Sequence, residues 1–442
     1  MKAFELTANI PTAWAISLGR QAIAPIAIFA IVFLGYYFST TSADYFSLNE
    51  LFGRTPPDWY KHYVYLAEAF LQGTLDVKSA GIPDFYQDTV TVGQAKYLPF
   101  APAPALLLMP FVALEGTGFS EVYFSMGLGA LNVVLFWFLL GMLGVSNTTR
   151  LLMVAFFAFG TAHFYSATTG TVWFFGHVTA VFFLLLAIIA LFRRAPPVLP
   201  AFLLGFAYLS REATVLSLPF FLYWIWRQRH DSITKESLLD RQSLWQMGQF
   251  CVALVPFVAF WFWYNIARFD GLFDTGYGTV HDSYTNGGIQ YTYYLTQFPD
   301  APRFNLFDVR NIPVHLHTML LMPPSFNPDW SVFRPSPYGM SVLLTSPAFI
   351  YAFLVKKKDV LRPACWMAIA AISVPIFLHY SQGWVQFGYR FLLDFAPFLL
   401  ILTALGFEEH SSLSGRRWQF ALVLLSVVAG FWGRHWANQL GW

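Results

Sequence analysis

The sequence predicts an all-α polytopic membrane protein with about eleven transmembrane helices. Of its 442 residues, 57% are hydrophobic and only 11% are charged, whereas a soluble domain carries about 25% charged residues. The apolar residues form long runs, such as 22–38, 122–143 and 173–192. A run of about 20 apolar residues is long enough to cross a bilayer as a helix. Basic residues gather in short loops between the runs, as membrane topology requires.

The expected spans, in chain order, are 21–39, 122–143, 151–167, 173–192, 198–211, 213–226, 249–267, 339–355, 363–380, 391–406 and 418–433. The stretch 99–114 is apolar but holds four prolines, which break interior helical hydrogen bonds. Its length reaches only about 24 Å, against a hydrocarbon core of about 30 Å. We therefore expect a juxtamembrane or re-entrant segment there. The stretch 198–226 carries Ser210-Arg211-Glu212 at its middle, which predicts two short helices meeting at a polar break.

More than half of the 26 Lys and Arg residues then fall in short loops on one side, which is the positive-inside pattern. The N-terminus is expected in the cytoplasm, and the chain is expected to be a multi-pass protein of the plasma (inner) membrane. Long loops 40–121 and 268–338 and the short segment 381–390 would be extracytoplasmic. A rival topology makes 99–114 a span and 198–226 one helix, but it moves basic loops outside and places Arg211 within the bilayer.

Composition and missing motifs exclude several classes. A net charge of +2 offers no basic field for nucleic acid. Cys251 and Cys365 lie in apolar runs, which suggests neither a disulfide framework nor a thiolate metal site. The sequence has no Walker loop, dinucleotide glycine motif or His-Glu-x-x-His site, and no Gly-x-Ser-x-Gly nucleophile elbow. A cytoplasmic nucleotide held by such a loop is therefore not the expected substrate.

The segment Thr55-Pro56-Pro57-Asp58 has the residue order of a helix start, with Thr55 as the N-cap. Asp58 would then either stabilise the helix N-terminus or serve as an acid–base group. The following helix would place Asp58 and His62 on a face separate from an apolar stripe, which consists of Trp59, Tyr63, Leu66 and Phe70.

Lys96-Tyr97 closes the first loop, and an ammonium beside a tyrosine suits a phosphate headgroup. The alternative is a lysine that anchors the segment by snorkelling. His177 stands at the outer start of a span, where it is either a helix-end residue or a catalytic group. Arg211-Glu212 either forms a mutual salt bridge or faces a functional cavity.

The segment 386–390 carries Gln386, Tyr389 and Arg390 around a glycine, which suits a phosphate or sugar contact. Arg390 could instead pair with Asp394 four residues on. The second long loop is rich in aromatic residues, including Tyr284 and Trp330. Aromatic faces suit sugars, but tyrosine is also the ordinary residue of a membrane interface.

Several of these residues resemble a family. Asp58-Trp59-Tyr60, Tyr63, the run 66–70 and Gly73 are similar to the first-loop motif of GT-C-type integral membrane glycosyltransferases, of the protein O-mannosyltransferase and aminoarabinose-transferase group. The order of later elements also matches: Lys96-Tyr97, a proline-rich segment, and a short glycine-containing span that ends at Arg211. The resemblance covers about residues 15–230, and a shorter similarity follows at residues 388–390.

The resemblance implies transfer of a sugar, with inversion, from a polyprenyl-phosphate donor to an acceptor hydroxyl on the extracytoplasmic face. Asp58 would be the general base, with His177 as a second catalytic position. Lys96 and Arg211 match positions that hold the lipid phosphate in the family. From their own chemistry, we expect Tyr97, Tyr389 and Arg390 also to bind the donor, and we expect the acceptor to be bound by His62, Gln386 and Trp330. Residues 1–230 would form the catalytic module, and 231–442 a C-terminal transmembrane region.

Two departures bear on metal dependence. Asp58 is followed by Trp59 rather than by a second acid, and His177 stands where the family commonly has a carboxylate. No cofactor is therefore expected, and a divalent metal is possible but unsupported. The acceptor could be a protein, a glycan or a lipid. Two alternatives stay open: a non-catalytic transporter or flippase, although the sequence shows no matching halves, and a degenerate partner subunit.

Overall fold

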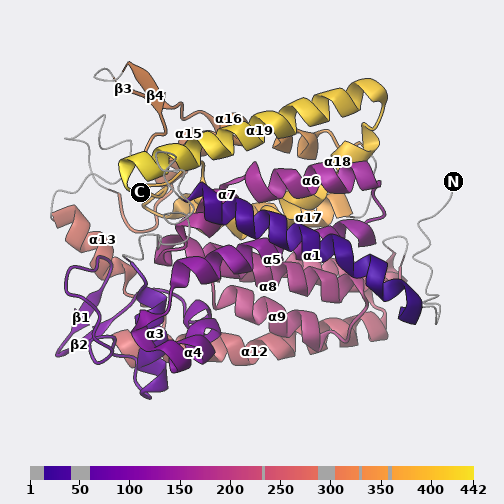
Figure 1. Cartoon of the computed structure of the whole chain (residues 1–442). Helices are drawn as coiled ribbons and strands as arrows, with labels where there is room; N and C mark the ends of the chain where they lie inside the picture. Colours follow the sequence, from indigo (N-terminus) through magenta and orange to yellow (C-terminus); the bar gives the residue numbers. More distant parts are fainter. Residues whose placement is uncertain (1–13, 41–59, 231–233, 287–303, 328–330, 357–360) are drawn as a thin grey trace.

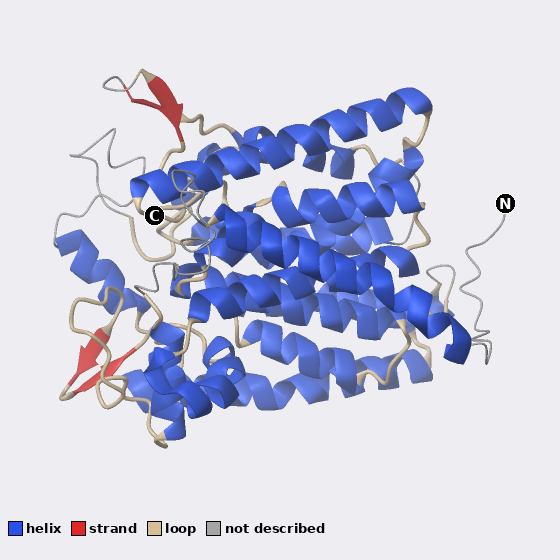
Figure 2. Cartoon of the chain, viewed as in Figure 1, coloured by secondary structure: helices blue, strands red, loops and turns tan. Residues whose placement is uncertain are grey.

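The computed structural model describes residues 14–40, 60–230, 234–286, 304–327, 331–356 and 361–442, and these parts of the chain are largely α-helical (Figure 2). The long helices lie side by side, and their connections gather at two opposite ends (Figure 1). The C-terminus, the β1–β2 hairpin and α13 lie at the same end, which we call the C-terminal end. Within the described ranges the strands form two antiparallel pairs, β1 (Val90–Val92) with β2 (Ala95–Tyr97) and β3 (Ser325–Asn327) with β4 (Val332–Arg334).

Five helices within the described ranges are long and apolar enough to cross a membrane, namely α5 (Glu121–Met142), α8 (Val172–Phe192), α12 (Arg241–Phe269), α17 (Leu361–Leu378) and α19 (Leu413–Leu440). A sixth span results if α6 (Asn147–Phe159) and α7 (Ala162–Thr169), bent by 48°, are counted together. The largely α-helical fold is thus confirmed, and the five or six candidate spans are consistent with a membrane protein, whereas the full set of about eleven spans is not confirmed.

The other expected spans correspond to shorter or broken helices. The predicted break at Ser210-Arg211-Glu212 is confirmed, because α9 (Val198–Tyr208) ends before it and a 3₁₀ turn, η2 (Glu212–Ser217), follows and leads into α10 (Leu218–Arg227). The expected span 339–355 is instead α16 (Val342–Thr345) followed by the 3₁₀ helix η3 (Pro347–Phe353). Pro347 explains this, since proline ends the preceding helix and starts a new one.

Two segments near the C-terminal end differ in how well they follow the prediction. The proline-rich stretch forms the short helix α4 (Ala103–Glu115), which continues through Pro110, and the turn η1 (Gly116–Gly118). Its expected juxtamembrane or re-entrant position stays a prediction. Helix α3 (His62–Leu71) begins later than expected, because Tyr60 and Lys61 are not helical. The Tyr60 carbonyl instead accepts a hydrogen bond from the backbone N–H of Val172 at 3.4 Å. Asp58 lies outside the described residues.

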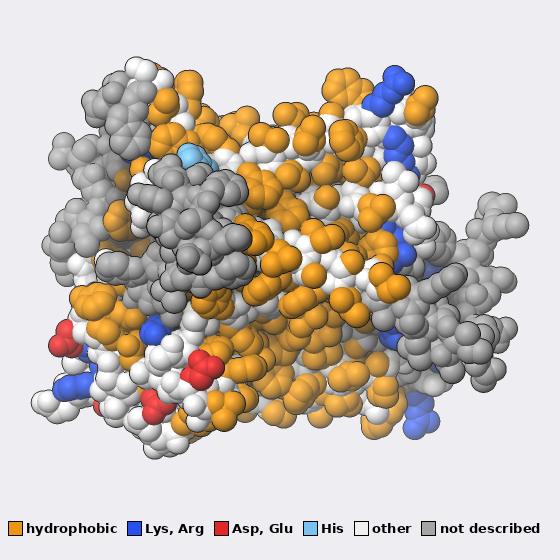
Figure 3. Space-filling model, in the orientation of Figure 1, with side chains coloured by type: hydrophobic (Ala, Val, Ile, Leu, Met, Phe, Trp, Pro, Cys, Tyr) orange, Lys and Arg blue, Asp and Glu red, His pale blue; other side chains and the backbone are white. Residues whose placement is uncertain are grey.

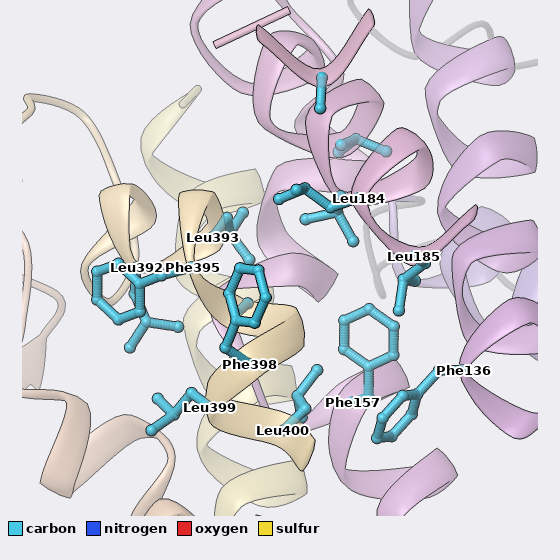
Figure 4. Packing of buried hydrophobic residues seen from close by; sticks show 14 of the residues in the cluster. Phe136, Phe157, Leu184, Leu185, Leu392, Leu393, Phe395, Phe398, Leu399 and Leu400 are labelled. Carbon is cyan, nitrogen blue, oxygen red and sulfur yellow. The ribbon is translucent and has the colours of Figure 1, made fainter. Parts of the chain in front are cut away.

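The remaining elements of the described ranges are α1 (Trp14–Ser39), α11 (Lys235–Leu238), α13 (Tyr277–Asn286), α15 (Asn311–Leu320), the 3₁₀ turn η4 (Arg390–Asp394) and α18 (Ala396–Glu409). The core joins α5, α6, α8, η4 and α18, and Figure 4 shows Phe136, Phe157, Leu184, Leu393 and Phe398 among its side chains. Helix α8 is the most enclosed candidate span, with 83% of its apolar window buried inside the protein, against 28% for α12.

The surface matches a protein that sits in lipid. On the face in Figure 3, a broad hydrophobic band covers the middle, Lys and Arg side chains line the right-hand end, and acidic side chains together with some Lys and Arg lie at the left-hand end. Helices α12 and α19 contribute exposed apolar residues, among them Val252, Val255, Leu425 and Val428. Such a band suits the hydrocarbon region of a bilayer.

Candidate functional site

A buried ion-pair cluster centres on Asp394, in the 3₁₀ turn η4. One carboxylate oxygen accepts a hydrogen bond from Nδ1 of His177 at 2.6 Å. Arg211 contacts the same carboxylate through Nε at 3.2 Å and Nη2 at 3.1 Å. The Asp394 side chain is 0% exposed, and that of Arg211 is 25% exposed. Because an unpaired buried charge is strongly unfavourable, Asp394 and Arg211 stabilise each other's ionised state.

This pairing differs from both local alternatives that the sequence left open. The ion pair that Arg211 makes among the described residues is with Asp394, not with Glu212. Asp394 likewise pairs with Arg211 and His177, not with Arg390. The i,i+4 expectation fails because residues 390–394 form a 3₁₀ turn, in which side chains three apart eclipse and those four apart diverge.

Glycine at position 176 allows the surrounding segments to approach α8. A Cβ atom there would lie 3.0 Å from the Tyr63 hydroxyl, 3.5 Å from the Ser210 carbonyl oxygen and 3.7 Å from Cδ of Arg211. Helix α3 and the break after α9 therefore both pack against the helix turn that carries His177. The Nε2 atom of His177 is buried and has no hydrogen-bond partner among the described residues.

Arg390 lies beside this cluster but is paired differently. It is 8% exposed, and its Nη1 donates to the Trp384 carbonyl at 3.1 Å. Its guanidinium lies 5.0 Å from the centroid of the Phe174 ring and 5.2 Å from that of Phe391, and the Arg211 guanidinium lies 5.5 Å from the same Phe391 ring. Within the described ranges Arg390 has no carboxylate partner, and its Nε has no hydrogen-bond partner. Arg390 is therefore a buried cation that forms no ion pair with a carboxylate among the described residues, although the more distant Asp88 attracts it.

The segment that presents Arg390 is held by backbone geometry and one side chain. Gly383 and Gly388 have φ angles of 96° and 73°, which glycine adopts without strain. Gln386 is fully buried and donates through Nε2 to the carbonyls of Gln382 and Tyr338, at 2.8 and 3.2 Å. Its Oε1 accepts from the backbone N–H of Arg390 at 3.3 Å. Gln386 thus braces the loop, and an acceptor contact by it stays a prediction.

Tyr389 points into the protein interior. Its hydroxyl lies 2.7 Å from Nδ1 of His315, whose Nε2 donates to the His379 carbonyl at 2.8 Å. Burial lowers the pKa of His315 to about 4, so this imidazole is neutral near pH 7. In this structure Tyr389 therefore positions the loop, and the expected contact between Tyr389 and a donor phosphate stays untested.

The first-loop residues lie in a second group. Lys96, in β2, forms an ion pair of 2.7 Å with the fully exposed Asp84, whose pKa it lowers by hydrogen bonding and charge. Tyr97 packs edge-on against Phe269. His62 is buried, and its Nε2 donates to the Gln87 carbonyl at 2.8 Å. Over the described ranges, no ion pair or hydrogen bond joins Lys96 to the Arg211–Asp394 cluster. Trp330 lies outside the described residues.

Asp88 was not expected in the site. It is half-buried in the first loop, with a left-handed φ of 55°, a conformation that Asp tolerates better than most residues. Its Oδ2 accepts a hydrogen bond from Nε1 of Trp173 at 2.5 Å, and its Oδ1 accepts one from the Tyr284 hydroxyl. No periodicity or spacing marks Asp88 in the sequence; only its acidic character in the long first loop could have drawn attention to it.

The first two turns of α8 bring these groups together. Trp173 binds Asp88, Phe174 lies against Arg390, and His177 binds Asp394. A helix N-terminus carries partial positive charge, so it adds to the field of the two arginines. Tyr277 of α13 lies near Arg211 and Arg390, and burial raises its pKa against their opposing charges. The site therefore groups two arginines, two carboxylates and the N-terminus of α8 at the C-terminal end of the molecule, and Arg390 is the arginine of this group that forms no ion pair among the described residues.

Metal ligands do not gather in the parts of the chain that the structure describes, where no group of three or more His, Cys, Asp or Glu side chains is placed to hold an ion. In comparisons with known proteins, no family model, no curated protein and no solved structure matched this chain. The likeness to GT-C glycosyltransferases is therefore carried by the quoted residues alone.

Proposed function

We propose that this chain is an integral membrane glycosyltransferase that moves a sugar, with inversion, from a polyprenyl-phosphate donor to an acceptor hydroxyl. The observation that carries the proposal is Arg390, a buried guanidinium without a carboxylate partner among the described residues. It shares the Phe391 ring with Arg211 and stands near the N-terminus of α8. A phosphate group supplies the charge that this arrangement lacks.

The chemistry needs fixed cations next to the leaving group. As the bond between the sugar carbon and the phosphate oxygen breaks, that oxygen gains negative charge, which oriented cations stabilise more in the transition state than in the ground state. Arg390 would contact the phosphate directly. Arg211, held by Asp394 through two nitrogens, is oriented before the donor binds and retains Nη1 for a further hydrogen bond.

The general base is proposed from the sequence. Asp58, outside the described residues, would take the proton of the acceptor hydroxyl as the oxygen attacks the sugar carbon, and a carboxylate in reach of that proton supplies the required base. Lys96 and Tyr97 would contact the donor from the first loop. The site would face the extracytoplasmic side, in a protein of about eleven spans whose N-terminus is cytoplasmic, so the prenyl chain would stay in lipid.

The test uses the purified full chain with a panel of radiolabelled polyprenyl-phosphate sugars, and it measures donor binding and sugar release separately. We expect Arg390→Gln to weaken donor binding at least about tenfold, because a hydrogen bond to a charged group contributes about 1.5–3 kcal/mol. We expect Asp58→Asn to bind donor but to turn over at least about 100-fold slower, as loss of a general base predicts.

Arg310→Gln is the matched control, since Arg310 is another arginine of the same end but is half-exposed and paired with Asp308. It should bind and turn over the donor like the wild type. The proposal fails if the wild type binds no donor in the panel, or if Arg390→Gln binds as tightly as Arg310→Gln.

A transporter or flippase for the same anionic lipid is the second candidate, and the broken helices favour it. The 48° bend between α6 and α7 and the break after α9 resemble the discontinuous helices of transporters. This candidate predicts that the wild type binds donor and moves it across liposome membranes without releasing sugar. A partner subunit without activity predicts neither release nor movement.

A further inference from the structure

We infer that Asp88 is the anchor of a carbohydrate-binding subsite, in which a hydroxyl of a sugar takes the place that the Tyr284 hydroxyl occupies in this structure. The inference rests in part on the proposed function, because it names the acceptor class as a polyhydroxyl compound, such as a glycan or glycolipid. A protein serine or threonine, with its single hydroxyl, would not use this subsite. The binding claim itself stands independently of the donor.

The hydrogen bonding at Asp88 is that of a hydroxyl receptor. Among the described residues, both bonds to its carboxylate come from neutral side chains, Nε1 of Trp173 and the hydroxyl of Tyr284, and none comes from a cation. A sugar hydroxyl can donate to a carboxylate oxygen the same type of hydrogen bond as a phenol hydroxyl does, and such charge-assisted bonds are short and strong. Trp173 belongs to the rigid helix α8, whereas Tyr284 belongs to the short outer helix α13, so Tyr284 is the replaceable partner.

Further aromatic rings pack next to Trp173, whose indole binds the Asp88 carboxylate. The Trp173 ring meets Tyr60 at a centroid distance of 5.1 Å, and Tyr60 meets Tyr86 at 5.4 Å and Phe85 at 6.5 Å. Phe85 is 63% exposed, while Tyr60 and Trp173 are half-buried, so parts of these rings face solvent. A few convergent polar groups within an aromatic surface make the usual design of a small-molecule site, and the apolar C–H faces of a sugar ring pack on such rings.

The subsite has a suitable position relative to the cationic group. Trp173, which binds Asp88, directly precedes Phe174, against which Arg390 lies. One turn further along α8, His177 binds Asp394. A sugar held at Asp88 by one hydroxyl would therefore be anchored to the helix turn that also positions the proposed phosphate-binding arginine. A neighbouring hydroxyl of the same sugar would be free to react.

The test measures carbohydrate binding without any donor. The full chain is placed in lipid nanodiscs free of glycoside detergents, and saturation-transfer NMR records binding of methyl α-mannopyranoside and methyl α-glucopyranoside. N-acetylserine methylamide serves as the single-hydroxyl probe. The variants are Asp88→Asn, Tyr284→Phe and, as the matched control on α13, Asp282→Asn, whose side chain is 73% exposed.

We expect at least one glycoside to bind the wild type more tightly than the serine probe does, and Asp88→Asn to weaken that binding about tenfold. Tyr284→Phe should tighten it a few-fold, because it removes the competing hydroxyl from Oδ1. Asp282→Asn should match the wild type. The opposite signs for Asp88→Asn and Tyr284→Phe separate a ligand site from a structural latch, which would make both variants lose binding and thermal stability together.

The inference is overturned if no glycoside binds the wild type, if Asp88→Asn binds as well as Asp282→Asn, or if Tyr284→Phe weakens binding. Donor binding, measured on the same nanodiscs with radiolabelled polyprenyl-phosphate sugar, keeps the two proposals apart. Glycoside binding without donor binding would reject the transferase and retain the carbohydrate subsite. Donor binding without glycoside binding would reject the subsite and retain the transferase.

Discussion

Replacing Asp394 with asparagine tests whether the stability that the buried cluster provides depends on the charge of the Asp394 side chain or only on its size and shape. The substitution retains the size of the side chain but removes the counter-ion of Arg211. At 3.1 Å and an effective dielectric constant of 20, the Coulomb attraction is about 5 kcal/mol. Removing one partner of a buried ion pair costs about 3–5 kcal/mol. We use the lower value, because Arg211 is 25% exposed and water screens it in part.

The expected effect is measurable as thermal unfolding in detergent. An unfolding entropy of about 2.1 cal/mol/K per residue over 442 residues means that about 3 kcal/mol lowers the melting temperature by about 3 °C. Asp84→Asn is the control, since it removes the fully exposed partner of Lys96 and should leave the melting temperature nearly unchanged. In the double variant Arg211→Gln/Asp394→Asn, part of the loss should be recovered. The charge argument is refuted if Asp394→Asn has the same melting temperature as Asp84→Asn. It is also refuted if the loss of stability in the double variant equals the sum of the losses in Arg211→Gln and Asp394→Asn.

Two further predictions concern residues that hold the loop of Arg390. Burial lowers the pKa of His315 to about 4, against about 6.5 in the unfolded chain, so its contribution to the free energy of unfolding is complete above about pH 6.5 and falls by about 3 kcal/mol as the pH drops to 4. His315→Gln should therefore flatten the curve of melting temperature against pH between 6.5 and 4, and an unchanged slope would refute the assignment. Gly388→Ala should lower the free energy of unfolding by about 1 kcal/mol and weaken donor binding, because Gly388 has a left-handed φ of 73°, although there is space for the added methyl group. Gly118 lacks a left-handed φ, so Gly118→Ala is the comparison, and equal losses of stability in the two variants would contradict the backbone argument.

Composition predicted the long helices because lipid imposes the same requirement on every one of them. The expected spans 122–143 and 173–192 became α5 (Glu121–Met142) and α8 (Val172–Phe192), within a residue or two. The polar break at Arg211 was also readable, since charged side chains in the middle of an apolar run are costly in lipid and mark the point where a span is interrupted. The expected span 339–355 failed where Pro347 outweighed an apolar composition.

The site was less accessible from the sequence, because its partners are distant along the chain. Asp394 lies 217 positions from His177 and 183 from Arg211. Local spacing instead suggested Glu212 as the partner of Arg211, and Asp394 as the partner of Arg390. Asp88 and Tyr284 are 196 positions apart. A pairing of this kind depends on how helices and loops pack, which a single sequence does not record. Asp58 and Trp330 keep their predicted roles as hypotheses, since both lie outside the described residues.

Helix α8 carries the three contacts of the site on one rigid segment, and its enclosure has a consequence for the surrounding bilayer. With 83% of its apolar window buried, α8 touches little lipid, whereas α12, at 28%, faces lipid along most of its length. A thicker or thinner membrane acts on lipid-facing helices by tilting them. Changes in membrane thickness would therefore reorient the outer helices of the bundle first. The spacing of Asp88, Arg390 and Asp394 would change less than the tilt of those outer helices.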